Sequence, residues 1–204
     1  MITIIDYGLG NIRAFENVYE RLNIPVSIAK TAEDLKDATK IILPGVGAFD
    51  HAMSKLNASG MREPLDKFVL LNSVPVLGIC VGMQMMAQSS EEGILPGLGW
   101  IDGTVKKMDV SVLKSKTKLP HMGWNTIKPN NGNHLLTSFN NDSIFYFLHS
   151  YYFQCNNQND TIATTDYGIQ FTSAVNYKNI YGVQFHPEKS HKGGIQLLKN
   201  FAEI

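Results

Sequence analysis

The sequence predicts an α/β fold: an open, mostly parallel sheet flanked by helices, with an antiparallel extension in the second half. Short apolar runs alternate with helical patterns through about residue 90, which is typical of parallel strands joined by crossover helices. After about residue 100 the segments become short, strand-like and rich in Asn, Gly and Thr. The chain has 204 residues and 44% hydrophobic content, enough for one sizeable core. We therefore expect a single domain over residues 1–204.

The first half contains the alternating strands and helices. We expect strands at residues 2–6, 25–29, 40–47 and 75–80. We expect helices at residues 11–23, 48–57, 61–72 and 82–88, and a short helix at 31–38 with Thr31 as its cap. The pattern is clearest in the first helix, where apolar side chains recur at helical spacing: Ile12, Phe15, Val18, Tyr19 and Leu22.

The second half is predicted to consist mainly of hairpin-linked strands. We expect them within residues 97–108, 143–153, 161–168, 169–177 and 180–185. The segment LPHMGWN, residues 119–125, is expected to be a loop. The chain is expected to end in a helix over residues 193–204.

Charge and composition argue against several classes of protein. Lys and Arg number 18, as do Asp and Glu, and no basic run is present, so we expect no nucleic-acid partner. No apolar stretch has the length of a membrane span, and the N-terminal segment MITIIDYGLGN lacks the basic region of a signal peptide. The only cysteines are Cys80 and Cys155, which form no disulfide framework. We expect a cytoplasmic protein that does not bind membranes.

The sequence carries no complete cofactor motif. DYGLGN resembles a dinucleotide fingerprint, but Arg13 stands where the third Gly is required. There is no Walker sequence for ATP, and His51, His134 and His191 lack the spacing of metal ligands. We expect neither a cofactor nor a metal.

Cys80 ends the apolar run PVLGIC and stands between Gly78 and Gly82, just before a helical pattern. This is the arrangement of a nucleophile elbow, with Cys in place of Ser. The small neighbours permit a tight turn that pushes the sulfur out of the sheet. The N-terminus of the following helix favours a thiolate and offers N–H groups to an oxyanion. The alternative is that Cys80 is a small buried hydrophobic residue.

His186 and Glu188 can supply the base that a nucleophilic Cys requires. His186 follows the run IYGVQF, so it also lies at a strand end, and Pro187 stiffens the turn. Glu188 lies two residues further on, where its carboxylate can orient the imidazole and stabilise its protonated form. The alternative is a solvent-exposed Glu. Together with the elbow, the segment favours a catalytic triad of Cys80, His186 and Glu188.

The segment LPGVGAF, residues 43–49, follows another strand, so its loop is expected at the same edge of the sheet as Cys80. The Gly residues on both sides of Val46 leave a peptide free to turn its N–H inward. We expect Val46 and Gly47 to form an oxyanion hole together with the N–H of Val81. The alternative is an ordinary turn.

Five motifs occur in the order found in class I glutamine amidotransferases: PGVGAF, GICVGMQ, PHMGWN, FLHSYYF and YGVQFHPEKS. The chain resembles this family over its whole length, which implies a flavodoxin-like sheet. Among its branches, DYGLGN and PHMGWN are similar to the glutaminase subunits of imidazole glycerol phosphate synthases, which serve histidine biosynthesis.

The resemblance implies a glutaminase that hydrolyses L-glutamine to glutamate and ammonia through a thioester on Cys80. His186 would transfer the protons, Glu188 would orient His186, and the substrate would be held by Gln84, His149, Ser150 and Tyr151. The resemblance also implies a heterodimer. Ammonia would pass through a tunnel to a (β/α)8-barrel synthase (cyclase) subunit, which makes imidazole glycerol phosphate and an aminoimidazole ribonucleotide (AICAR). The implied partner-facing surface comprises Tyr7, Gly8, Asn11, His121, Met122, Trp124 and Asn125.

Three alternatives remain open from the sequence. GLGWIDGTV and EKSHKGG, and Val81 where Leu is more usual, are also similar to paralogues that supply ammonia to sugar-modifying amidotransferases in surface-polysaccharide biosynthesis. A second alternative is a non-catalytic scaffold, but such proteins typically lose the Cys or the His that this chain retains. A third is a Cys hydrolase that works without a partner, such as a peptidase or a γ-glutamyl hydrolase.

Overall fold

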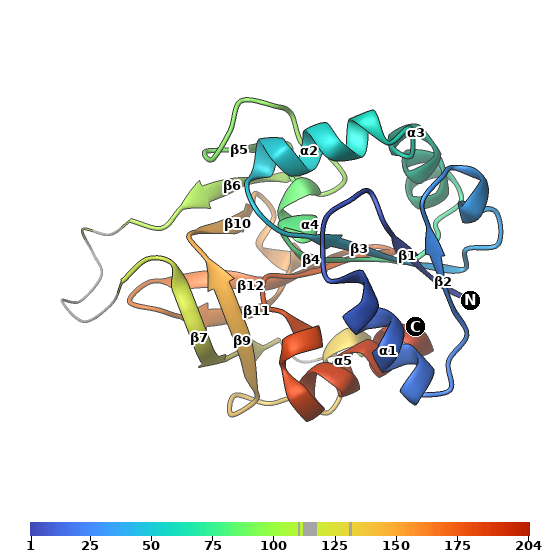
Figure 1. Ribbon diagram of the computed structural model, residues 1–204. Coiled ribbons are helices and arrows are strands. Elements are labelled where there is room, and N and C mark those ends of the chain that lie inside the picture. Colours follow the sequence, from blue (N-terminus) through green and yellow to red (C-terminus); the bar gives the residue numbers. More distant parts are fainter. Residues whose placement is uncertain (110, 112–117, 131) are drawn as a thin grey trace.

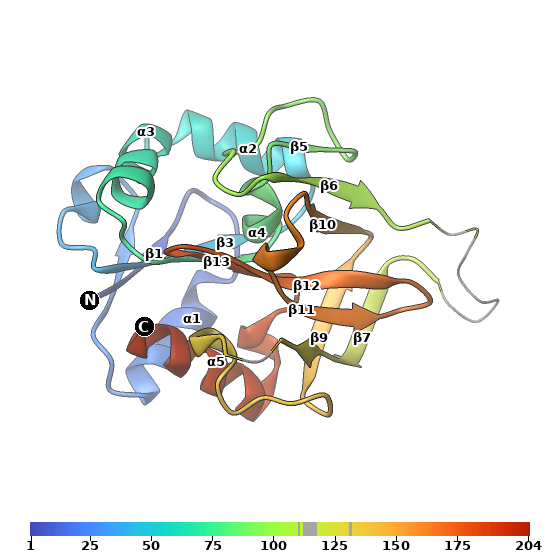
Figure 2. The same ribbon diagram turned by 180° about the vertical axis from the view of Figure 1, so that it is seen from behind.

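A large twisted sheet with helices on both faces forms the body of the computed structural model, which describes residues 1–109, 111, 118–130 and 132–204 (Figure 1). Helices α1 (Ile12–Arg21) and α5 (His191–Glu203) lie on one face of this sheet. Helices α2 (Phe49–Ala58), α3 (Arg62–Asp66) and α4 (Val81–Met85) lie on the other face, as the reverse view also shows (Figure 2).

The large sheet has a parallel half and an antiparallel half. The parallel strands, in spatial order, are β2 (Val26–Ala29), β1 (Ile2–Ile5), β3 (Lys40–Gly45), β4 (Val76–Cys80) and β13 (Ile180–Val183). The antiparallel strands that continue the sheet are β12 (Gln170–Tyr177), β10 (Tyr151–Cys155) and β6 (Gly103–Lys107). Three further strands complete it: β5 (Ser89–Ser90), β11 (Thr161–Asp166) and β8 (Lys128–Pro129). The prediction of a mostly parallel α/β sheet with an antiparallel extension is confirmed.

The parallel strands are buried because helices cover both faces of that half of the sheet. Every residue of β1, β4 and β13 is buried, which explains why these strands read as continuous apolar runs and not as alternating patterns. Phe15 and Tyr19 of α1 point into this core, and the Tyr19 hydroxyl donates to the Leu198 carbonyl of α5 at 3.3 Å. The helices therefore pack on each other as well as on the sheet.

The turn from β4 into α4 is built on an unusual backbone conformation at Cys80. Its φ is 55° and its ψ is −113°, a region that residues other than Gly rarely occupy. Glycines let the backbone close around this turn. A Cβ on Gly82 would lie 2.0 Å from the Leu43 carbonyl oxygen, and a Cβ on Gly78 would lie 2.8 Å from the Gly82 carbonyl oxygen. Helix α4 can therefore approach the sheet only with Gly at these positions.

Two predicted helices differ from the observed elements. In the segment 31–38 there is only a 3-10 turn, Glu33–Leu35. Asp34, and not Thr31, provides the side-chain acceptor: its carboxylate accepts the backbone N–H groups of Lys30 and Thr31 at 2.9 Å each. The segment 61–72 is helical, but it changes from α3 to a π-helical turn over Lys67–Leu71.

The segment 143–153 is two strands that belong to different sheets, and not one strand. Ser150 separates β9 (Ile144–His149) from β10. Strand β9 is not part of the large sheet and pairs instead with β7 (His121–Thr126) in a separate two-stranded sheet. The expected loop at 119–125 therefore contains most of a strand. Its local signals, Pro120 and a Gly123 with φ of 130°, do not favour a strand, and its pairing with β9 decides the structure.

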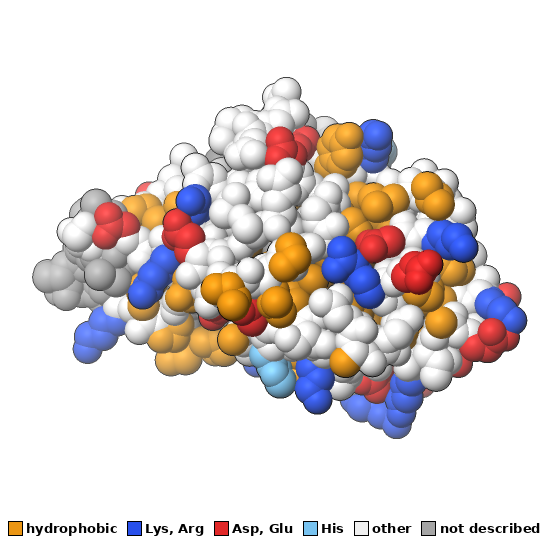
Figure 3. Space-filling view, turned by 90° about the horizontal axis from the view of Figure 1, so that it is seen from above, with side chains coloured by type: hydrophobic (Ala, Val, Ile, Leu, Met, Phe, Trp, Pro, Cys, Tyr) orange, Lys and Arg blue, Asp and Glu red, His pale blue; other side chains and the backbone are white. Residues whose placement is uncertain are grey.

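The described surface carries charges of both signs. Figure 3 shows Lys and Arg side chains interspersed with Asp and Glu on one face of the molecule. None of the described helices is long and apolar enough to cross a membrane.

Gly82→Ala should lower the free energy of unfolding by about 1–3 kcal/mol, because the backbone must shift to accommodate a methyl group next to the Leu43 carbonyl. Denaturant-induced unfolding measures this loss. The matched control is Gly193→Ala in α5, where the atom nearest to the new Cβ would be 3.6 Å away. This substitution should raise the free energy of unfolding by up to about 1 kcal/mol. A Gly82→Ala protein as stable as the wild type would contradict the close packing of the elbow.

Candidate active site

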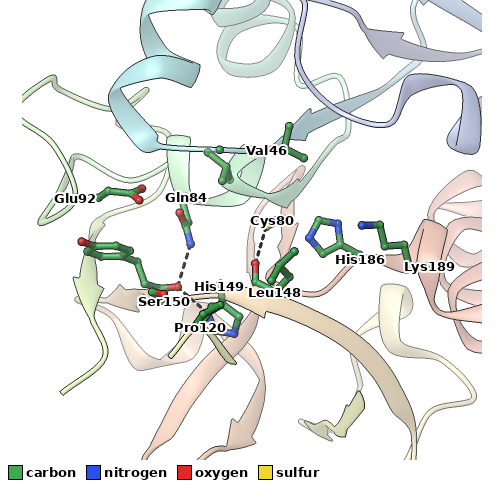
Figure 4. Close-up of a pocket in the computed structure, with 13 residues that line it drawn as sticks. Val46, Cys80, Gln84, Glu92, Pro120, Leu148, His149, Ser150, His186 and Lys189 are labelled. Carbon is green, nitrogen blue, oxygen red and sulfur yellow. Dashed lines mark hydrogen bonds between the residues drawn. The ribbon is translucent and has the colours of Figure 1, made fainter. Parts of the chain in front are cut away.

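A cavity of about 350 Å³ opens at the carboxyl ends of β3 and β4, the edge where open α/β sheets bind ligands. Figure 4 shows Cys80 near its centre, with Glu92 on one side and His186 and Lys189 on the other. The cavity brings together nine residues that the sequence singled out: Val46, Gly47, Cys80, Val81, Gln84, His149, Ser150, Tyr151 and His186. These residues come from the loop after β3, from β4, α4, the β9–β10 junction and the segment after β13, so only the fold places them in one site.

Cys80 presents its sulfur to the cavity from the strained elbow. The residue is only 4% exposed, so the sulfur is reached through the cavity and not from the open surface. The thiol lies 3.9 Å from the carbonyl oxygen of Leu148, its hydrogen-bond acceptor. The side-chain amide of Gln184 donates to the sulfur at 3.7 Å.

His186 and Glu188 are joined by a buried hydrogen bond. The imidazole Nδ1 donates to the carboxylate at 2.9 Å, and the two side chains are 5% and 2% exposed. The bond is local, because Glu188 lies in the 3-10 turn Pro187–Lys189 that directly follows His186. Because Nδ1 is used in this way, Nε2 is the ring nitrogen available to Cys80.

The backbone of His186 is fixed by strand β9. Its N–H donates to the Tyr146 carbonyl at 2.8 Å, and its own carbonyl accepts the Ser190 hydroxyl at 2.6 Å. The Ser190 oxygen in turn accepts the N–H of Tyr146 at 3.0 Å. The small β7–β9 sheet thus sets the position of the imidazole relative to the elbow.

The pKa of His186 reflects its two partners. Burial lowers this pKa, but hydrogen bonds with Cys80 and Glu188 and the negative charges of both outweigh burial and raise it to about 10. The raised pKa favours the protonated form of the ring. A buried imidazolium between a carboxylate and a sulfur is the arrangement that activates a thiol nucleophile.

The loop after β3 lies above Cys80 in the cavity (Figure 4). Gly47 has a φ of 84°, which suits Gly, and the Val46 side chain is 38% exposed. The base of the loop is fixed by Tyr7, whose hydroxyl donates to the Pro44 carbonyl at 2.8 Å. Burial, and next the charge of Cys80, raise the pKa of Tyr7, so it remains a protonated donor. The oxyanion role of Val46, Gly47 and Val81 stays a prediction that this position permits.

Gln84 lies one helical turn after Cys80 and is braced by the protein. Its Nε2 donates to the Tyr151 carbonyl and to the Gln184 side-chain oxygen, each at 3.0 Å. Both amide protons are therefore used within the protein, and Oε1 is the atom left for a ligand. The prediction that Gln84, His149, Ser150 and Tyr151 hold the substrate stays a prediction, with this restriction on Gln84.

A chain of hydrogen bonds connects the cavity to strand β7. His149 Nδ1 bonds to the Tyr151 carbonyl at 2.8 Å, and His149 Nε2 bonds to His121 Nδ1 at 3.0 Å. Because a carbonyl only accepts, Nδ1 of His149 is protonated, its Nε2 accepts, and His121 donates. Asn125 then donates to Nε2 of His121 at 3.2 Å. The order of donors and acceptors is thus fixed along the chain.

Both imidazoles in this chain are held neutral. Burial lowers the pKa of His121 to about 4. Burial, followed by the charge of His121, lowers the pKa of His149 to about 3; the charge of His186 acts in the same direction, and the hydrogen bond to Tyr151 opposes them. Neutral rings are what the donor order requires, since a doubly protonated ring could not accept.

The structure corrects two residues of the predicted partner-facing surface. The side chains of Tyr7 and His121 are 5% and 2% exposed and bond within the chain, so they are not surface groups. Met122 and Trp124 are 64% and 49% exposed. Gly8 and Asn11 are exposed and Asn125 is partly buried, so these positions remain predictions.

The sequence interpretation missed several residues that contact the site. Glu92 lines the cavity and also accepts the N–H of Phe49 at 2.9 Å, but the acidic segment SSEEG carries no spacing signal. Gln184 and Lys189 lie inside the motif QFHPEKS. They were given no role because His186 and Glu188 of the same motif already accounted for the expected chemistry. Within the described residues, no group of three or more His, Cys, Asp or Glu side chains is placed to hold a metal ion.

The family profile described as glutamine amidotransferase class-I matches residues 3–204. The chain belongs to the class I glutamine amidotransferase family. The resemblance inferred from the motifs is confirmed, and with it membership in a family of enzymes. The chain is similar over its full length, and over the full length of each relative, to imidazole glycerol phosphate synthase subunits HisH: 58% identical in Bdellovibrio bacteriovorus and 52% in Leptospira interrogans.

Solved structures of the family share the fold at low sequence identity. A glutamine amidotransferase has a TM-score of 0.75 and 17% identity, covering 100% of this chain and 99% of that one. A glutamine amidotransferase from Thermotoga maritima has a TM-score of 0.64 and 18% identity, covering 99% of this chain and 83% of that one. These structures support the fold alone.

Acid should destabilise the protein through His121 and His149. Their pKa values are lowered by folding, so between pH 6.5 and about 4 the unfolded chain binds protons that the folded chain does not. The free energy of unfolding should therefore fall as pH drops through this range, by up to about 1.4 kcal/mol per pH unit for each ring. Urea unfolding at pH 6.5, 5.5 and 4.5 measures the slope within this range.

His121→Gln should reduce this slope, since one of the two rings is gone and Gln can still donate to His149. The matched control is His51→Gln, an exposed position on α2, which should keep the wild-type slope. Equal pH dependence in wild type and His121→Gln would mean that His121 is not held neutral by the fold.

Proposed function

We propose that this chain is the glutaminase subunit of an imidazole glycerol phosphate synthase. It would hydrolyse L-glutamine to glutamate and ammonia and pass the ammonia to a (β/α)8-barrel partner subunit. The observation that carries the proposal is the strained Cys80 at a strand end, facing a buried His186–Glu188 pair in one cavity. The name shared by full-length relatives at 58% and 52% identity supports the choice of pathway.

The first half-reaction forms a thioester. With the proton on His186, the sulfur of Cys80 attacks the carboxamide carbon of glutamine, and the carbonyl oxygen becomes an oxyanion. Backbone N–H groups of Val46 or Gly47 and of Val81 would stabilise this charge. The tetrahedral intermediate then collapses: the C–N bond breaks, and the leaving nitrogen takes the proton from Nε2 of His186 and departs as ammonia.

The second half-reaction releases glutamate. Neutral His186 takes a proton from water, the oxygen adds to the thioester carbon, and the C–S bond breaks. The thiolate and the imidazolium are restored, and the second proton of the water leaves with the product carboxyl group. Glu188 stabilises the charged ring in both steps but does not itself need to accept a proton.

The charged groups at the two sides of the cavity suit an amino acid substrate. Glu92 contributes a carboxylate to the cavity lining on one side of Cys80 (Figure 4). We assign it to the α-ammonium group of glutamine, since it is an acid that faces this cavity. Lys189 lies on the opposite side, beside His186, and remains available to a partner or to the outgoing product.

The proposed partner surface lies next to the site. Met122 and Trp124 expose large apolar side chains on β7, and the Trp124 ring stacks on His191 at the start of α5 with centroids 5.0 Å apart. Exposed aromatic and Met side chains are enriched in protein interfaces. A heterodimer would therefore be formed close to β7. A nucleophilic thiol must stay reduced, which favours the cytoplasm as its compartment.

The alternatives have less support. The full-length relatives bear the name of the histidine-pathway subunit, so a paralogue of surface-polysaccharide biosynthesis is not favoured. A scaffold without activity would have no need of a strained Cys beside an imidazolium. A hydrolase that works alone would be fully active without a partner, so the glutaminase activity of the chain alone distinguishes this alternative.

Cys80→Ala should abolish glutamine-dependent turnover by the complex, by at least about a hundredfold, because no other group forms the thioester. Turnover with free ammonium salts should be retained. Both rates are measured with the barrel subunit of the same organism and its nucleotide substrate present. The matched control is Cys155→Ala, the other buried cysteine, which lies outside the cavity and should leave both rates unchanged.

Undiminished glutamine-dependent turnover by Cys80→Ala would contradict the proposed mechanism. High glutaminase activity of the wild-type chain in the absence of any barrel subunit would contradict the proposed role as one half of a complex.

A further inference from the structure

The side chain of Gln184 is buried directly behind the reacting sulfur. Gln184 follows β13 and is 0% exposed. Its backbone N–H is used in the sheet, where it donates to the Ser173 carbonyl at 2.9 Å. Its side chain bonds to two groups of the site: the sulfur of Cys80 at 3.7 Å and Nε2 of Gln84 at 3.0 Å. Burying an amide costs free energy unless its polar atoms form hydrogen bonds, so these two contacts stabilise the buried side chain.

The orientation of the Gln184 amide follows from hydrogen-bond chemistry. The Tyr151 carbonyl can only accept, so the atom of Gln84 that lies 3.0 Å from it is the nitrogen. The second proton of that nitrogen faces Gln184, so the atom of Gln184 at 3.0 Å must be its oxygen. The Gln184 nitrogen is therefore the atom that faces Cys80, and it presents an N–H to the sulfur.

Besides His186, the sulfur has two polar neighbours, and these favour opposite protonation states of Cys80. The Leu148 carbonyl, 3.9 Å away, can interact favourably only with a thiol, because it has no proton to give. The Gln184 N–H, 3.7 Å away, interacts most strongly with a thiolate, because hydrogen bonds to charged acceptors are about twice as strong as neutral ones. When the proton moves from Cys80 to His186, the first contact is lost and the second is strengthened.

We propose that Gln184 is the hydrogen-bond donor that holds and stabilises the thiolate of Cys80, oriented for this purpose by Gln84 and the Tyr151 carbonyl. The proposal rests on the proposed function only in taking Cys80 as the nucleophile. Gln184 would act on the sulfur before glutamine binds. The oxyanion donors, in contrast, act on the substrate. It also gives Gln84 a second task, since one of its protons sets the orientation of Gln184.

The test is the pH dependence of Cys80 alkylation by iodoacetamide in the purified full chain, read by mass spectrometry of the Cys80 peptide so that Cys155 does not contribute. Gln184→Glu keeps the size and the acceptor oxygen for Gln84 but places a carboxylate against the sulfur. Gln184→Met keeps the approximate size and removes the donor. Both variants should move the midpoint of the alkylation profile upward, by about one to two pH units.

The matched control is Gln154→Glu, a Gln on strand β10 whose side chain is exposed, which should keep the wild-type profile. Thermal unfolding identifies a variant that is not folded, and the second variant then decides. Profiles of Gln184→Glu and Gln184→Met that coincide with that of the wild type would overturn the proposal.

Alkylation does not require glutamine turnover, so the proposal and the proposed function can fail separately. A shifted midpoint in a chain that never hydrolyses glutamine would support the donor role of Gln184 and contradict the glutaminase. An unshifted midpoint in an active glutaminase would contradict Gln184 alone.

Discussion

The positive φ of Cys80 is the constraint on which the site depends. A residue with a side chain in this region costs about 1–3 kcal/mol, so the surrounding structure must hold it there. Glycines at 78 and 82 do so by allowing α4 to approach the sheet until backbone atoms are in contact. The consequence is chemical as well as structural. The turn takes the sulfur out of the plane of the sheet and into the cavity, where His186 can exchange a proton with it.

A single acceptor, the carbonyl of Tyr151, organises the rest of the site. It accepts from Gln84 on one side and from His149 on the other. Since a carbonyl cannot donate, it fixes the amide orientation of Gln84 and the tautomer of His149, and through them the groups beyond. One chain of bonds ends at the sulfur of Cys80 and the other at Asn125 on β7, next to the exposed apolar residues Met122 and Trp124. Strand β7 is therefore connected to the cavity by hydrogen bonds whose donors and acceptors are fixed.

Local features were predictable from the sequence, and features that depend on distant pairing were not. The elbow at Cys80 and the turn from His186 to Glu188 are each formed within a few residues, so spacing was sufficient. Strand β7 was predicted to be a loop because it becomes a strand only by pairing with β9, where His121 lies opposite His149. Tyr7 and His121 were predicted to face a partner, but burial is decided by the whole fold. Gln184 was overlooked because a neutral amide gives no spacing or charge signal, although it lies two residues before His186.

The most direct measurement is an NMR titration of the His186 ring in the wild type and in Cys80→Ala, with the His186 signals assigned from the spectrum of a His186→Gln variant. If the thiolate and Glu188 together hold the imidazolium, His186 in the wild type should stay protonated through neutral pH and titrate near pH 10. In Cys80→Ala the same ring should titrate at a clearly lower pH, because one of its two negative partners is gone while burial remains. A ring that titrates near pH 6.5 in both proteins would show that Cys80 and His186 share no proton, and would contradict the charge pair on which the mechanism rests.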